Sequence, residues 1–194
     1  IKMENTHYYW QGKRIKLRPL QADDWKLTIA EEDDSEGIRV LEAGIQLPRS
    51  AQQLQDSYRE ASERMLKLDE TSTINFIVET LDGEPVGAVW MHSRNPRNGT
   101  FSFAVRISRS YRRQGYAAEA IRILLKYGFE ELRYHKANSA TISCNEASIQ
   151  LHQALGFKIE GRLRDNVYTN GQYYDEVLFG MTRDEYDQVK RNAA

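Results

Sequence analysis

A change in hydrophobic period between residues 101 and 132 constrains the fold of this chain more than any other feature. Apolar residues alternate from Phe101 to Ile107, which is the period of a strand. From Ala117 to Leu132 they recur with the spacing of an amphipathic helix. The sequence therefore predicts a strand, a short loop and a helix over this range, with the change of period at the loop.

The loop that joins this strand to the helix is basic and contains a glycine. Arg109, Arg112 and Arg113 precede Gly115, which stands just before the predicted helix. The first amide groups of a helix lack partners within it and carry partial positive charge, so an anion is stabilised there. Glycine lets the backbone approach a phosphate closely because it has no side chain. The loop is therefore predicted to bind a pyrophosphate.

A second strand and helix follow further along the chain. Residues 141–144 are predicted to form a strand, and a short helix is expected between Asn145 and the Leu155-Gly156-Phe157 sequence. Because a strand, helix, strand unit needs a right-handed crossover, the strands at 101–107 and 141–144 should be parallel. The other connections read as hairpins, so the sheet should be mixed. Further strands are predicted at residues 13–20, 73–80, 86–92, 157–168 and 173–182, and further helices from residue 22 and at 50–68.

Together the two segments resemble the GCN5-related N-acetyltransferases, the GNAT family. The acetyl-CoA signature of this family is a Gln or Arg, two residues, Gly, one residue, and then Gly or Ala. Here Arg112, Gly115 and Ala117 occupy these positions. The second cofactor element of the family is an Asn, a short helix and a Leu-Gly-Phe stop, as at residues 145–157. From residue 14 to 186 the chain resembles the branch that includes ribosomal-protein N-terminal acetyltransferases and bacterial spermidine N-acetyltransferases.

This resemblance implies a fold, a co-substrate and a set of binding residues. The expected fold is α+β: one domain over residues 3–190, with a mostly antiparallel twisted sheet, a central splayed parallel strand pair and helices on both faces. The expected co-substrate is acetyl-CoA, whose pantetheine arm would lie between the splayed strands. The residues implied in binding it are Val105, Ile107, Arg112, Arg113, Gln114, Gly115, Tyr116, Ala117, Asn145 and Ser148.

Two positions depart from the family pattern. Ser102 stands where many members carry a Glu on the strand before the loop, so the general base is unassigned. His152 stands where many relatives carry a tyrosine that protonates the leaving thiolate, and we treat it as a candidate general acid. The alternative for His152 is a histidine that bonds the backbone or touches CoA without taking part in the chemistry. Candidates for the base are Glu79, Glu84, Asp175, the acidic run at residues 31–36 and solvent.

Composition limits the other functions. With 194 residues, 40% of them hydrophobic, and a net charge of −1, the chain fits one ordinary domain and is not expected to bind nucleic acid or an anionic membrane. One cysteine and no long apolar run indicate the cytoplasm. Cys144 is expected to be a small buried side chain of a strand rather than a nucleophile. His7, His92 and His135 lack metal-ligand spacing, so no metal site is predicted.

The activity implied by the resemblance is direct transfer of an acetyl group to a primary amine, by a protein that can form a homodimer. A polyamine such as spermidine is the first expectation, because the acidic run at 31–36 lies in the region that shapes the acceptor pocket and could attract a polycation. The same run could be a solvated loop. The N-terminal α-amine of a ribosomal or other protein is the alternative, since its pKa of about 7.7 to 8.0 suits a site without an obvious base. A non-catalytic acyl-CoA sensor is the candidate from another class, because Ser102 and His152 replace family residues.

Overall fold

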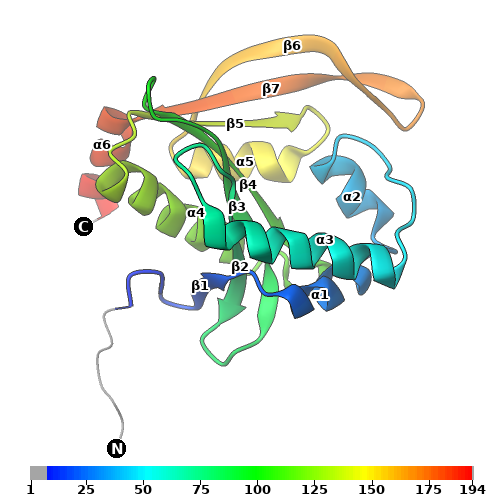
Figure 1. Cartoon of the computed structure of the whole chain (residues 1–194). Helices are drawn as coiled ribbons and strands as arrows, with labels where there is room; N and C mark the ends of the chain where they lie inside the picture. The colour runs from blue at the N-terminus through cyan, green and yellow to red at the C-terminus, as the bar shows by residue number, and fades with distance from the viewer. Residues whose placement is uncertain (1–7, 194) are drawn as a thin grey trace, which may run out of the picture.

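Seven strands form one mixed sheet in the computed structural model, which describes residues 8–193 (Figure 1). His7, named above in connection with metal binding, lies outside the described residues. The strand order is β1-β2-β3-β4-β5-β7-β6. The strands are β1 (Ile15–Pro19), β2 (Ile74–Thr80), β3 (Pro85–Asn95), β4 (Thr100–Ile107), β5 (Lys136–Ile142), β6 (Lys158–Thr169) and β7 (Gln172–Thr182). The helices are α1 (Trp25–Ile29), α2 (Ser35–Leu41), α3 (Ala51–Arg64), α4 (Tyr116–Lys126), α5 (Glu146–Ala154) and α6 (Arg183–Ala193).

One parallel strand pair lies at the centre of this sheet. β4 and β5 run parallel and are in register only from Thr100 opposite Lys136 to Ser102 opposite Asn138. Beyond these residues the two strands separate, while the other neighbouring strands in the sheet are antiparallel. The expected fold class is therefore confirmed, including the splayed parallel pair.

Helices cover both faces of the sheet, because alternate side chains of β4 point to opposite sides. On one face Phe101 packs against Phe129, just after α4, with ring centroids 5.7 Å apart, and Phe103 stacks on His152 of α5 at the same distance. On the other face the Arg106 guanidinium donates to the Thr28 hydroxyl of α1 at 2.8 Å. Helix α3 lies on this second face, as Figure 1 shows, and buries Leu54.

The helix expected to end at Leu132 changes geometry before that residue. α4 is α-helical only to Lys126, and residues Tyr127–Glu131 form a π-helical turn. Gly128 lies in this turn against the ring of Phe101, where a Cβ atom would be 2.6 Å from Cζ. The close approach of backbone and ring thus fits glycine alone, and sequence periodicity does not reveal it.

Two local expectations were wrong. The strand predicted at 141–144 is β5, which begins at Lys136 and ends at Ile142, because the Asn145 amide turns back to donate to the Ile142 carbonyl at 2.9 Å. Cys144 stands in that turn and is exposed, not buried. Helix α2 begins at Ser35, within the acidic run at residues 31–36, so the end of that run is helical. In residues 8–193 no helix is both long and apolar enough to cross a bilayer.

Candidate active site

A cavity of about 750 Å³ lies where β4 and β5 separate. Its walls come from both strands, the basic loop, the first turn of α4, helix α5 and helix α2. All of the residues implied in cofactor binding line it except Gln114, and His152 lines it as well. The cavity residues from this set are Val105, Ile107, Arg112, Arg113, Gly115, Tyr116, Ala117, Asn145, Ser148 and His152.

The backbone of the basic loop turns through left-handed conformations just before α4. Arg113 has φ of 64° and Gly115 has φ of 80°. A Cβ atom on Gly115 would lie 2.7 Å from Nη2 of Arg14, so a side chain here would force the Arg14 guanidinium to shift. Successive amides in such a turn at a helix N-terminus form a concave site for an anion.

Arg14 is part of this loop structure although it lies about 100 residues away in sequence. Its guanidinium donates to the Gln114 carbonyl at 2.5 Å and to Glu119 at 3.0 Å, and its backbone amide donates to Glu119 at 2.9 Å. Burial alone would raise the pKa of Glu119, but these bonds from Arg14 lower it overall. Arg14 and Glu119 therefore fix the start of α4. No spacing in the sequence indicates this contact.

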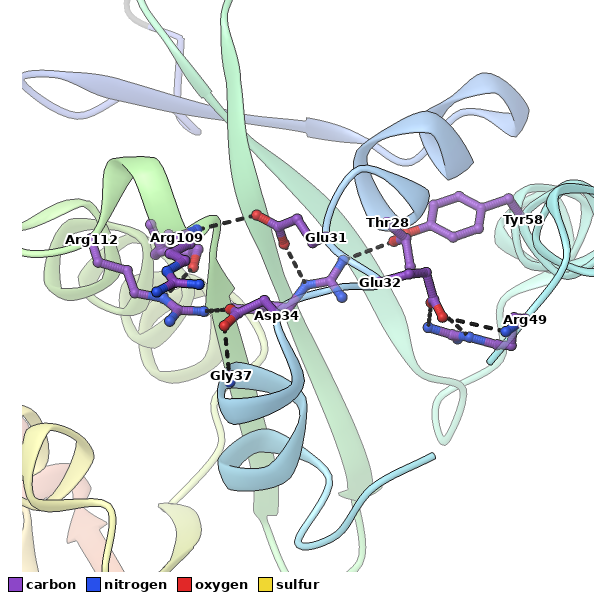
Figure 2. Close-up of polar contacts among 11 residues, drawn as sticks. Thr28, Glu31, Glu32, Asp34, Gly37, Arg49, Tyr58, Arg109 and Arg112 are labelled. Carbon is purple, nitrogen blue, oxygen red and sulfur yellow. Dashed lines mark hydrogen bonds and ion pairs between the residues drawn. The ribbon is translucent and has the colours of Figure 1, made fainter. Parts of the chain in front are cut away.

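Arg112, the first residue of the signature, is held by a carboxylate from α2. Its Nε donates to the Ile107 carbonyl at 3.1 Å, and its Nη2 lies 2.5 Å from Oδ2 of Asp34. Asp34 also caps α2 by accepting from the Gly37 amide at 3.2 Å (Figure 2). A Cβ atom on Gly37 would be 2.5 Å from Nη2 of Arg112, so a glycine here makes room for the ion pair.

The acidic run at residues 31–36 is largely neutralised by arginines. Glu31 accepts from the Arg109 amide at 3.2 Å and lies 3.8 Å from Arg106, while Glu32 lies 2.6 Å from Arg49 (Figure 2). With Asp34 on Arg112, three of the five carboxylates of the run are paired. Asp33 and Glu36 are exposed. The run thus mainly connects α1 and α2 to β4 and the loop after it through ion pairs, and fewer of its carboxylates are unpaired than the sequence suggests.

The other candidate bases are paired and do not line the cavity. Glu79 pairs with Lys16 at 2.7 Å and with Arg18 at 2.6 Å; burial would raise its pKa, but these partners lower it overall. Glu84 accepts from the Tyr111 hydroxyl at 2.9 Å, and Asp175 pairs with Arg162 at 3.2 Å. No carboxylate is among the described residues that line the cavity.

His152 is buried against three aromatic rings, and both of its ring nitrogens are engaged. The ring stacks on Phe179 at 4.7 Å and contacts Phe103 and Phe157. Nδ1 lies 2.7 Å from the Ser148 carbonyl oxygen, and Nε2 lies 2.8 Å from Oγ of Ser139. Burial lowers the pKa of His152, so the neutral ring is favoured. Because a carbonyl only accepts, the proton of the neutral ring is assigned to Nδ1.

Asn145 begins α5 as its N-cap, and its Oδ1 accepts from the Ser148 amide at 3.2 Å. The cavity therefore has an amide-rich, arginine-bearing end at α4 and a second end between β4 and β5, where apolar residues such as Phe103 and Val105 stand beside Ser139 and His152. This chemistry suits a ligand with phosphates at one end and a long narrow arm at the other.

The fold and this cavity define an acyltransferase of the kind that takes its acyl group from a CoA thioester. Residues 14–158 match the sequence model of the Acetyltransferase (GNAT) domain. The chain belongs to this family, and it is an acetyltransferase whose acetyl donor is acetyl-CoA.

Named relatives and solved structures agree with this membership. The SPbeta prophage-derived uncharacterized N-acetyltransferase YokL of Bacillus subtilis is 37% identical over 179 residues, which is 92% of this chain and 96% of YokL. The spermidine N(1)-acetyltransferase of Escherichia coli K12 is 28% identical over 173 residues, or 89% of this chain and 88% of that protein. A crystal structure of spermidine N-acetyltransferase from Vibrio cholerae with CoA and spermine superposes with a TM-score of 0.76 at 21% identity, covering 89% of this chain and 97% of that one.

Proposed function

We propose that this protein transfers the acetyl group of acetyl-CoA to a primary amine of a polyamine such as spermidine. The observation that carries the choice of acceptor is the 28% identity, over 173 residues, with the spermidine N(1)-acetyltransferase of Escherichia coli. Asp33 and Glu36 add support because they are exposed at the start of α2, which lines the cavity through Gly37, Val40 and Leu41. Two exposed carboxylates on the element that contributes to the cavity wall favour an acceptor with several positive charges.

In this proposal the residues of the cavity divide the work of holding acetyl-CoA. The amides at Gly115, Tyr116 and Ala117 bind the pyrophosphate, with charge from Arg112 and Arg113 beside them. The backbone of Val105 and Ile107 pairs with the pantetheine arm, and Asn145 and Ser148 contact it from α5. The thioester supplies an activated acetyl group, and the chain supplies its orientation and the path for the proton.

A protein N-terminal α-amine is the second candidate, and the absence of any carboxylate from the described cavity lining favours it. An α-amine has a pKa of about 7.7 to 8.0, against about 10.4 for a lysine-like amine, so more of it is neutral without a base. The putative ribosomal N-acetyltransferase YdaF of Bacillus subtilis is 28% identical over 109 residues, or 56% of this chain and 60% of YdaF.

Release of free thiol from acetyl-CoA tests the proposal directly. The panel contains spermidine, spermine, short peptides with free N-termini and an aminoglycoside. Turnover with the polyamines above the rate without acceptor is the expected result, and turnover with peptides alone would replace the polyamine by the α-amine. Binding of acetyl-CoA without turnover on any amine would favour the non-catalytic sensor. The homodimer, the cytoplasmic location and the lack of nucleic-acid binding stay predictions.

A further inference from the structure

Ser139 and His152 form a polar pair just beyond the point where β4 and β5 separate. Ser139 follows Asn138, the last residue of β5 in register with β4. Its hydroxyl oxygen lies 2.8 Å from Nε2 of His152, and both residues line the cavity. The pair therefore stands at the closed end of the gap, away from the basic loop that begins α4.

The direction of the hydrogen bonds in this pair follows from the Ser148 carbonyl. Nδ1 of His152 donates to that carbonyl at 2.7 Å, so Nε2 of the neutral ring carries a lone pair. The Ser139 hydroxyl must then donate its proton to Nε2. The remaining lone pairs of the serine oxygen are free to accept a proton from a group in the cavity. A neutral His152 has no N–H left for direct donation to a ligand.

We propose that Ser139 is the catalytic residue that exchanges protons with the reacting groups, and that His152 is a positioning residue that acts through it. The inference rests on the acetyl transfer proposed above but not on which amine accepts the acetyl group. One C–N bond forms, one C–S bond breaks, and one proton must pass from nitrogen to sulfur. The amine nitrogen gives its proton to Ser139 while the serine proton moves to Nε2 of His152. The reverse movement then delivers a proton from Ser139 to the departing sulfur, and both residues return to their starting state.

Two other Ser or Thr side chains line the cavity, Thr141 and Ser148, and Oγ of Ser148 lies 3.4 Å from Nδ1 of His152 rather than against Nε2. The tyrosines that line the cavity lie at its other end: Tyr111 donates to Glu84, and Tyr116 lies beneath the Arg14 guanidinium at 5.8 Å. The side chains in contact with the His152 ring are Phe103 of β4, Phe157, Phe179 of β7, Ser139 of β5 and Ser148 of α5. None of them is charged, and Ser139 is the one that bonds Nε2, so in this proposal a proton reaches Nε2 through Ser139.

Substitution of Ser139 tests the proposal. Ser139→Ala is expected to lower kcat about 100-fold, the lower end of the usual contribution of a positioned proton-transfer group, and to leave the KM for acetyl-CoA within about threefold. Ser139→Thr keeps a hydroxyl at the same atom and should recover most of the lost rate. Ser143→Ala is the matched control, because Ser143 follows the same strand and is not among the cavity residues. A Ser139→Ala enzyme with kcat close to that of the wild type would overturn the proposal while leaving the proposed function intact.

A second measurement needs neither acetyl-CoA nor turnover. In protein labelled with ¹⁵N at histidine, the NMR signals of His152 should show a proton on Nδ1 and an Nε2 that accepts a hydrogen bond. Ser139→Ala should shift the Nε2 signal, and Ser143→Ala should not. A proton on Nε2 in the wild type, or an Nε2 signal unchanged by Ser139→Ala, would overturn the proposal. Wild-type protein that acetylates no amine would instead contradict the proposed function, and the NMR result would still decide whether this pair is formed.

Discussion

Gly115 provides the sharpest test of the phosphate site, because the structure separates two consequences of replacing it with alanine. The backbone there is left-handed, with φ of 80°, and the added Cβ atom would lie 2.7 Å from Nη2 of Arg14. An L-residue in this conformation costs about 1 to 2 kcal/mol. For a protein of this size, about 1 kcal/mol lowers Tm by roughly 2 to 4 °C, so Gly115→Ala should lower it by about 2 to 8 °C.

The second consequence of Gly115→Ala concerns ligand binding. If the methyl group prevents even one amide from reaching a phosphate, the loss is about 1.5 to 3 kcal/mol, the usual value for a hydrogen bond to a charged group. That corresponds to roughly 10- to 150-fold weaker binding of acetyl-CoA. Isothermal titration calorimetry measures the affinity, and thermal denaturation without ligand measures the stability.

Gly171→Ala is a matched control for this experiment. Gly171 has φ of 78° in the β6–β7 turn, and a Cβ atom there would meet nothing within 4 Å. It should therefore lose about as much stability as Gly115→Ala from the backbone alone, and acetyl-CoA affinity should not change. Equal affinities of the two variants would refute the assignment of the phosphate to this loop.

Three further perturbations test other contacts of the site. Asp34→Asn should tighten acetyl-CoA binding by a few-fold, because it releases Arg112 from its ion pair while the asparagine side chain can still cap α2. Unchanged or weaker binding at low salt would show that Arg112 does not bind the phosphates. Glu119→Gln should cost about 1 to 3 kcal/mol in the free energy of unfolding at pH 7, because Arg14 loses a charged acceptor. Since the pKa of Glu119 is lowered in the folded protein, this contribution to stability is present above the unfolded pKa of about 4.3 and is lost as pH falls through the folded pKa. In denaturant unfolding, the stabilities of the wild type and Glu119→Gln should therefore converge in acid. A difference in stability that stays constant with pH would refute the assignment. The double variant Asp33→Asn, Glu36→Gln should raise the KM for spermidine several-fold and leave the KM for a monoamine unchanged. Glu63→Gln, on the exposed surface of α3, is the control. An equal rise in KM for both amines would show that these carboxylates do not recognise the polyamine.

Local sequence patterns were sufficient to predict the part of the site that is local in the chain. The strand from Phe101 to Ile107, the loop and the start of α4 follow one another without interruption, so periodicity and one glycine define them. The connections that read as hairpins include the turns at Asp82-Gly83 and Asn170-Gly171, and both glycines have positive φ.

Long-range contacts could not be predicted in this way. Arg14 reaches the Gln114 carbonyl and Glu119 from about 100 residues away in the sequence, and nothing in its own neighbourhood indicates a partner. The acidic run seemed unpaired in the sequence because its arginine partners come from the segment before α3, from β4 and from the basic loop, which only the fold brings together. Cys144 was misjudged because the strand ends at Ile142, and an error of two residues at a strand end changes a side chain from buried to exposed.

The short pairing of β4 with β5 bears on how the sheet responds to its ligand. Within the described residues, the register from Thr100 to Ser102 is the only strand pairing between the antiparallel half β1–β4 and the antiparallel half β5, β7, β6. A molecule that lies between the two strands contacts both halves, and its binding free energy resists their separation. At a ligand concentration 100 times Kd this amounts to about 2.7 kcal/mol. Acetyl-CoA would then join the two halves of the sheet where strand pairing is absent, and the Tm of the protein would rise with the occupancy of the gap.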